Sequence, residues 1–140
     1  MSAPLCPPTA SAIPHDSGKA AHETSARPLR VLLISHTCQS PTEGQPKTEL
    51  IAQMPGVELV TLIPHRWKHY GQWRLAATVP EPRCRYEIGK VVWPWAGPGQ
   101  FYLHWYPGLK KLLRAFQPDV IDLWEEPWAL VSAHAVWLRN

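Results

Sequence analysis

Residues 118–140 read PDVIDLWEEPWALVSAHAVWLRN, and this stretch decides the fold that the sequence predicts. Its first part, residues 119–124, is a short and mainly apolar run, typical of a buried strand. Pro127 suits the first position of a helix, because its missing N–H would have no intrahelical partner there. Apolar residues then recur at helical spacing, at Val131, Ala135 and Leu138. The stretch therefore predicts a strand, an acidic turn and a helix that ends near Arg139.

Two upstream segments have the composition of strands that are covered on both faces. Residues 29–35 (LRVLLIS) form a near-continuous apolar run, and residues 57–63 (VELVTLI) are rich in β-branched side chains. Between them, residues 47–54 (KTELIAQM) predict a helix. The expected apolar face of this helix consists of Leu50, Ile51 and Met54. The order strand, helix, strand predicts a parallel unit with a right-handed crossover.

The middle of the chain is less regular. Residues 64–82 show no apolar periodicity and predict a long irregular loop. Residues 85–95 predict a third strand with a weak point at Gly89, and residues 96–100 (AGPGQ) predict a turn.

Residues 101–116 predict an amphipathic helix that packs on the sheet. Trp105 and Leu109 are expected on its buried face. Pro107 either kinks this helix or begins its regular part.

Strands and helices thus alternate along the chain, which indicates an α/β fold class. We expect a Rossmann-like parallel sheet with flanking helices. The strand at residues 29–35 should be central, with the strands at residues 57–63 and 119–124 as its parallel neighbours.

Length and composition indicate one domain. The chain has 140 residues, of which 45% are hydrophobic, and it contains eight Trp. Residues 1–28 predict a disordered leader before a domain at residues 29–140. Asp16 and Glu23 argue against a cleaved transit peptide. A formal net charge of +3 is mild, and no nucleic-acid partner is expected.

Cysteine and histidine spacing bears on metals and on the compartment. Cys6, Cys38 and Cys84 form no CxxC pair, which favours a reducing, cytoplasmic compartment over a disulfide framework or a zinc site. Among the seven His, only His65 and His69 have a spacing that suits a metal, and both lie in the expected irregular loop. No metal is therefore expected. No apolar run approaches the roughly 18 to 20 residues needed to span a bilayer.

Two strand ends carry side chains that could perform chemistry. His36 follows the first strand, and Glu125 and Glu126 follow the last one. If the strand order reverses near the first strand, these ends share a crevice, and the three residues become candidates for an acceptor cleft that binds hydroxyl groups or moves protons. The alternative interpretation is that the two acids favour the positive N-terminus of the following helix and that His36 is a loop residue.

Residues 66–74 interleave cations with aromatic side chains. The candidates for contact with a ligand or a membrane are Arg66, Trp67, Lys68, Tyr70, Trp73 and Arg74. Such side chains can stack on sugars or bases, or lie against lipid headgroups. The alternative is a surface loop whose Trp side chains pack on the sheet while its cations reach solvent.

Four segments together resemble the N-terminal, acceptor-side domain of family-four retaining glycosyltransferases with the GT-B fold. In chain order they are RVLLISH (residues 30–36), the expected helix at residues 47–54, PGVELVTLIPHRWKHYGQW (residues 55–73) and GPGQFYLHWYPGLKKLLRAFQPDVIDLWEEPWALVSAHAVWLRN (residues 97–140). The most specific parts are PHRW and PDVIDLWEEPW. The resemblance covers residues 29–140, which is part of such a domain. The first loop departs from the family, because CQSPTEGQP stands where relatives often bear glycines or a basic and aromatic run.

The resemblance implies transfer of a glycosyl unit from a nucleotide sugar to an acceptor, with retention at the anomeric carbon and no obligatory metal. The nucleotide-sugar donor would belong to a C-terminal domain, so this part should bind no cofactor and be inactive alone. Neither GxGxxG nor GxxxxGK[ST] occurs, which agrees with that expectation.

The resemblance further implies that the acceptor is a sugar or a lipid-linked molecule, and that the protein contacts the inner face of the membrane. A function from another class stays open. It is a non-catalytic α/β binding or interaction module that uses the basic and aromatic loop at residues 66–74.

Overall fold

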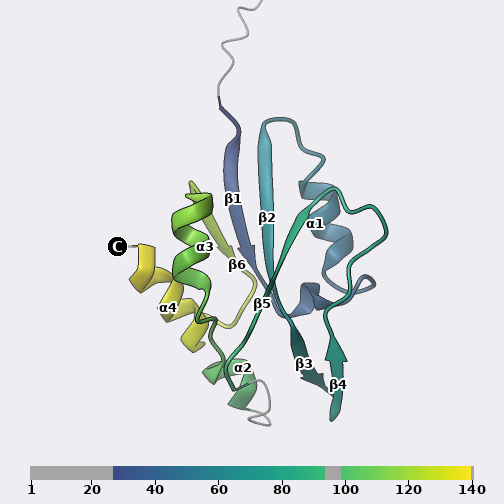
Figure 1. Ribbon diagram of the computed structural model, residues 1–140, viewed down its shortest axis with the longest axis vertical. Coiled ribbons are helices and arrows are strands. Elements are labelled where there is room, and N and C mark those ends of the chain that lie inside the picture. Colours follow the sequence, from purple (N-terminus) through teal and green to yellow (C-terminus); the bar gives the residue numbers. More distant parts are fainter. Residues whose placement is uncertain (1–26, 94–98, 140) are drawn as a thin grey trace, which may run out of the picture.

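A four-stranded parallel sheet organises the computed structural model, which describes residues 27–93 and 99–139 (Figure 1). Its strands, in spatial order, are β5 (Arg85–Gly89), β2 (Val57–Pro64), β1 (Leu29–Ile34) and β6 (Val120–Leu123). Strand β1 pairs in parallel with β2 and with β6, as the apolar runs predicted. The fold is therefore α/β and Rossmann-like, with β1 inside the sheet. The expected leader at residues 1–28 lies largely outside the described residues.

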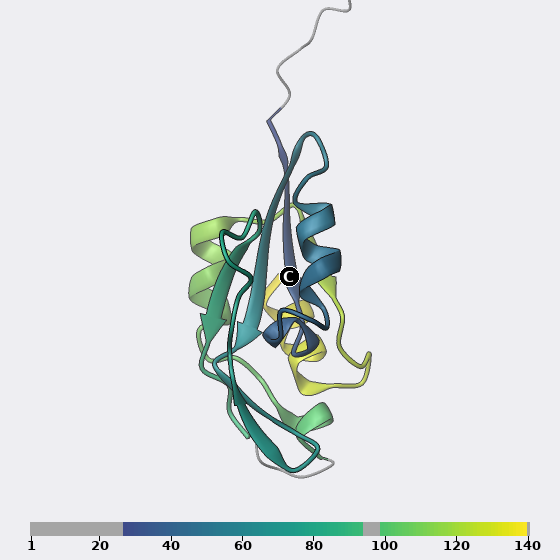
Figure 2. The same cartoon turned by 90° about the vertical axis from the view of Figure 1, so that its right-hand side faces the viewer.

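Helices cover both faces of the sheet (Figures 1 and 2). They are α1 (Gln45–Ile51), α2 (Gln100–Leu103), α3 (Leu109–Phe116) and α4 (Leu130–Arg139), with a short 3₁₀ turn η1 (Thr37–Gln39) after β1. No helix among the described residues is both long enough and apolar enough to cross a membrane.

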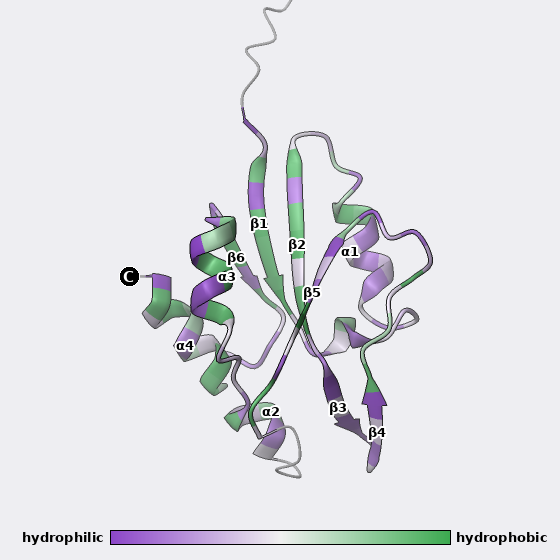
Figure 3. Cartoon of the chain, in the orientation of Figure 1, coloured by the Kyte–Doolittle hydropathy of each residue, from purple (hydrophilic) through white to green (hydrophobic). Residues whose placement is uncertain are grey.

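The core has two halves because the side chains of a strand alternate between faces. Leu32 and Ile34 of β1 join the half beneath α3 and α4, and Leu33 joins the half beneath α1. All three are fully buried. A continuous apolar run is what such a central strand requires, and Figure 3 shows β1 and β2 coloured largely as hydrophobic.

Helix α1 buries only part of the expected face, because Ile51 packs partly buried against the core half beneath the helix. Leu50 is 66% exposed and Met54 is 56% exposed, whereas Gln45 and Thr48 are fully buried. The Gln45 side chain donates to the carbonyls of Cys38 and Ala77 and accepts from the N–H of Val79. These bonds compensate its burial, so the helix is held by polar contacts that an apolar pattern does not reveal.

Residues 101–116 do not form one helix. Helix α2 ends at Leu103, and α3 begins at Leu109, just after Pro107. Pro107 therefore precedes the regular part of the segment, which is one of the two expected outcomes. Trp105 lies in the connection and is only partly buried, which corrects its assignment to a buried helical face. Tyr106 takes the buried position instead, with 1% exposure.

The expected irregular loop contains an antiparallel hairpin, β3 (Arg66–His69) and β4 (Gln72–Leu75). Tyr70 and Gly71 form its turn with φ of 48° and 80°. Two central residues with positive φ are the backbone of a tight hairpin turn whose twist matches the strands. Glycine takes this conformation readily, but tyrosine seldom does, so the sequence signal for the hairpin was weak.

Two element boundaries also differ from those expected. Strand β5 ends at Gly89, where an added Cβ would lie 2.8 Å from the Tyr106 side chain, so close packing requires glycine there. The strand does not continue through residues 90–93, where Val92 forms only an isolated bridge with Trp105. Residues 94–95, and most of the expected turn at residues 96–100, lie outside the described residues. Helix α4 begins at Leu130, because Pro127 is part of a preceding turn closed by the N–H of Ala129 on the Glu126 carbonyl.

Leu109 provides a test of how α3 is seated. It is fully buried in the core half beneath α3 and α4. We expect Leu109→Ala to lower the free energy of unfolding by about 2 to 5 kcal/mol, since the change removes buried methyl groups and leaves a cavity. Urea unfolding measures the loss. Leu50→Ala on α1 is the matched control, and because Leu50 is 66% exposed its effect should be far smaller; equal losses would contradict this packing.

Candidate functional site

The carboxyl end of the sheet joins His36 to Glu125. His36 follows β1, and Glu125 follows the neighbouring strand β6. The backbone N–H of His36 donates to Glu125 Oε1 at 2.6 Å, and His36 Nδ1 lies 2.6 Å from Glu125 Oε2. Both carboxylate oxygens are thus engaged by one residue. The ends of these two neighbouring strands therefore bring together the first two of the three candidate residues.

Glu125 is a buried carboxylate. Its side chain has no exposed area. Burial pushes the pKa of Glu125 upward, but the contacts with His104 and His36 outweigh burial, so the pKa lies below its ordinary value of 4.5. Glu125 is consequently ionised at neutral pH, and it favours a hydrogen on His36 Nδ1.

Glu126 behaves differently from its neighbour. It is exposed, and its side chain makes no hydrogen bond or ion pair within the described part of the chain. Its carbonyl accepts from Ser132 Oγ at 2.9 Å, which ties the start of α4 to the preceding turn. Glu126 is therefore not brought to His36. The interpretation of both acids as partners of a helix N-terminus fails for Glu125, whose carboxylate faces two histidines.

His104 completes the surroundings of Glu125, although no sequence motif marks it as a site residue. It is fully buried in the connection after α2. Its Nδ1 lies 2.8 Å from the carbonyl of Gln100, so this nitrogen carries the hydrogen. Its Nε2 lies 3.6 Å from Glu125 Oε2, which is too far for a hydrogen bond. The only signal was a histidine within the apolar stretch FYLHWYPG, which suggested a helix instead.

Trp67 fixes the plane of the His36 ring. The two rings stack with centroids 4.8 Å apart and an angle of 24°. Trp67 is only 2% exposed, so it is not the surface contact that the pattern at residues 66–74 suggested. Phe101 adds an edge contact to the same imidazole at 5.5 Å. Together, the two aromatic rings and Glu125 leave His36 little freedom to rotate.

A small cavity opens beside His36. Its volume is about 30 Å³, enough for roughly two water molecules. It is lined by His36, Thr37, Gln39, Ser40, Glu43, Trp67, His69 and Arg74. Since Nδ1 faces Glu125, Nε2 is the nitrogen left for a ligand, and it makes no hydrogen bond within residues 27–93 and 99–139. The cavity suits one hydroxyl group better than a whole sugar ring.

The charged residues at this cavity are already paired. Arg74 Nη1 lies 3.0 Å from Glu43 Oε1, and His69 Nδ1 lies 3.9 Å from the same oxygen. Arg74 is therefore not a free cation for a phosphate. Cys38, nearby after β1, is also no nucleophile, because burial raises the pKa of its thiol to about 11.

No family model, curated protein or solved structure matches the chain. The resemblance to glycosyltransferases thus depends on the segments quoted above. Among the described residues, no three His, Cys, Asp or Glu side chains are grouped so that they could hold a metal ion.

Within residues 27–93 and 99–139, several buried polar atoms near Glu125 have no hydrogen-bond partner. They are Trp67 Nε1, Gln100 Oε1, His104 Nε2 and the Tyr106 hydroxyl. Burial, followed by the negative charge of Glu125, raises the pKa of Tyr106 well above 10.0. Buried polar atoms of this kind are the groups that an ordered water molecule or a ligand can satisfy.

Proposed function

We propose that residues 29–140 are the acceptor-side part of a family-four retaining glycosyltransferase with the GT-B fold. The observation that carries this proposal is the His36–Glu125 pair at the carboxyl end of the two adjacent strands β1 and β6. Ligands of parallel α/β sheets bind at this edge. A buried carboxylate that orients a histidine also leaves the second ring nitrogen free to act on a hydroxyl group.

The proposed chemistry uses His36 as the residue that receives the acceptor. An acceptor hydroxyl enters the cavity and donates a hydrogen bond to His36 Nε2. Its oxygen bonds to the anomeric carbon of the donor on the same face from which the diphosphate oxygen leaves, so the configuration is retained, and the hydroxyl proton passes to Nε2. The products are the glycosylated acceptor and a nucleoside diphosphate. Glu125 acts as a positioning residue, since it fixes the tautomer and orientation of His36.

In this proposal the donor nucleotide is held by a C-terminal half. The only glycine in the loop between β1 and α1 is Gly44, and it serves packing: an added Cβ would lie 2.6 Å from Cys38 Sγ. Gly44 is thus explained without a phosphate. The acceptor is a sugar or a lipid-linked molecule that presents one hydroxyl group to the cavity.

A non-catalytic binding module is the second candidate function. It is favoured by the exposure of Tyr70 and Trp73 on the hairpin, at 90% and 47%. In that case the hairpin would carry the activity, and the His36–Glu125 pair would only stabilise the end of the sheet.

Release of nucleoside diphosphate from a panel of nucleotide sugars, with candidate acceptors, separates the two functions. We expect no acceptor-dependent release by the 140-residue chain, because transfer requires both reactants to be positioned together. A longer polypeptide that joins these residues to a donor-binding half should release it. Robust release by the isolated chain would refute the proposal that a separate half holds the donor. If the longer polypeptide releases no nucleoside diphosphate, glycosyl transfer itself is refuted.

A further inference from the structure

The β3–β4 hairpin presents two chemically different faces. Cross-strand partners share a face, and neighbours along a strand alternate. Trp67 pairs with Arg74 and points into the protein, where Trp67 is buried. Lys68 pairs with Trp73, and Arg66 pairs with Leu75, on the opposite face. We call Arg66, Lys68, Trp73 and Leu75, together with Tyr70 at the turn, the hairpin surface.

The hairpin surface combines exposed apolar area with unpaired cations. Leu75 is 69% exposed, Trp73 47% and Tyr70 90%. The Arg66 guanidinium lies over the Trp73 ring, 5.0 Å from its centroid. Neither Arg66 nor Lys68 forms an ion pair within the described part of the chain, and no member of the surface is acidic. The nearby acid, Glu43, pairs with Arg74 on the other face.

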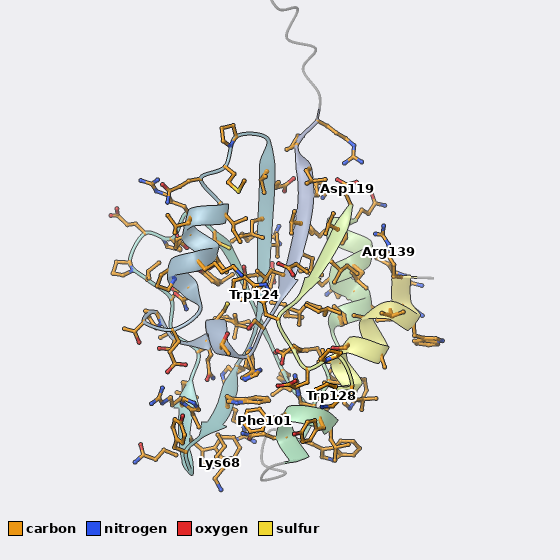
Figure 4. The ribbon with its side chains drawn as sticks, turned by 180° about the vertical axis from the view of Figure 1, so that it is seen from behind. Lys68, Phe101, Asp119, Trp124, Trp128 and Arg139 are labelled. Atoms are coloured by element: carbon orange, nitrogen blue, oxygen red, sulfur yellow. The ribbon has the colours of Figure 1, made fainter. Side chains whose placement is uncertain are left out.

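The hairpin is held firmly against the body of the protein. The Gln39 side chain donates to the Pro64 carbonyl, just before β3, and to the Arg74 carbonyl in β4. Gln100 of α2 donates to the Lys68 carbonyl at 2.6 Å. Figures 1 and 2 show the hairpin and α2 at the same end of the molecule, and Figure 4 places Lys68 and Phe101 there, away from Asp119 and Arg139. The surface is therefore a fixed platform.

We propose that the hairpin surface docks on an anionic lipid bilayer. Tyr and Trp favour the headgroup level of a membrane, where their rings meet the apolar boundary and their polar atoms stay hydrated. Lys68 and Arg66 supply charge complementary to anionic headgroups. A nucleic acid fits less well, because two cations neutralise few phosphates and Leu75 has no role against a polyanion.

This contact would bring the cavity at His36 close to the lipid surface. Trp67, His69 and Arg74 line that cavity from the other face of the hairpin. A lipid-linked acceptor could then reach His36 without leaving the bilayer. That last step rests on the proposed function, whereas the membrane contact itself does not.

Cosedimentation of the full chain with vesicles tests the proposal. The probes are vesicles of phosphatidylcholine alone and vesicles of phosphatidylcholine with phosphatidylglycerol. We expect binding to the anionic vesicles that weakens with salt, because exposed charges are screened. Lys68→Gln should lower the partition coefficient about fivefold, and Trp73→Ala about tenfold through lost apolar contact.

Two substitutions on other elements are matched controls. Lys111→Gln on α3 removes an exposed cation, and Trp137→Ala on α4 removes a Trp that is 71% exposed. Both variants should bind as the unmodified chain does, and circular dichroism checks that every variant folds. Absent binding, equal binding to neutral vesicles, or equal losses in the controls would overturn the proposal. So would binding of single-stranded DNA that Lys68→Gln and Trp73→Ala abolish, since the partner would then be a nucleic acid.

Discussion

Replacing Glu125 with alanine is expected to lower the free energy of unfolding by about 3 to 5 kcal/mol. The substitution removes a buried carboxylate that accepts two hydrogen bonds from His36, each 2.6 Å long. It also removes the charge that lies 3.6 Å from the fully buried His104. The loss is large because the two partly buried His36 donors are left without their acceptor.

Glu126→Ala is the matched control, since it removes the same side chain one residue away. Glu126 is exposed, and its carboxylate has no partner among the described residues. Its removal should change the free energy of unfolding by less than about 0.5 kcal/mol. Urea unfolding of the two variants at neutral pH measures the difference. Similar losses in both variants would show that Glu125 does not hold the end of the sheet together.

The contribution of Glu125 to the free energy of unfolding should decrease at acidic pH. The pKa of Glu125 in the folded protein lies below 4.5, because the contacts with His104 and His36 outweigh the opposing effect of burial. A depressed carboxyl pKa contributes stability that is fully present above the unfolded pKa and is lost as pH falls through the folded pKa. The stability gap between the unmodified chain and Glu125→Gln should thus narrow as the pH falls below about 4.5. A gap that widens below that pH would contradict the lowered pKa.

The parallel sheet was predictable because its central strands can be recognised from short apolar runs in the sequence. Residues 29–35 and 57–63 are apolar over the length of a strand, and a strand buried on both faces needs such a run. Their pairing followed from the general rule for strand, helix, strand units. The meeting of His36 with Glu125 followed in turn, since carboxyl ends of parallel strands share one edge. Topology thus carried the prediction from single strands to a pair of side chains.

Features stabilised by specific polar contacts were not predictable. Gln45 is fully buried in α1 because carbonyls of distant segments accept its hydrogen bonds, and an apolar pattern contains no trace of them. The hairpin depends on Tyr70 in a conformation that tyrosine seldom takes. His104 reaches Glu125 only because the segment 101–116 breaks before Pro107, whereas an unbroken helix would have placed it elsewhere. Each of these depends on tertiary contacts that local periodicity cannot report.

The largest effect on activity is expected from His36→Ala in the sugar-transferring longer polypeptide. If His36 Nε2 takes the proton of the acceptor hydroxyl, removing the imidazole should lower kcat/KM by about 10² to 10⁴, the usual contribution of a positioned acid–base group. Glu125→Gln should reduce kcat by a smaller factor, because it loosens the tautomer and orientation of a histidine that Trp67 still stacks upon at 4.8 Å. Nucleoside diphosphate release at saturating donor measures both effects.

Glu126→Gln is the matched control for the two substitutions in the His36–Glu125 pair. It keeps the backbone carbonyl that accepts from Ser132 and alters only an exposed carboxylate, so its kcat/KM should stay close to that of the unmodified enzyme. A loss in Glu126→Gln as large as that in His36→Ala would place the reacting group outside the buried pair. Near-full activity of a folded His36→Ala variant would exclude His36 as the proton acceptor.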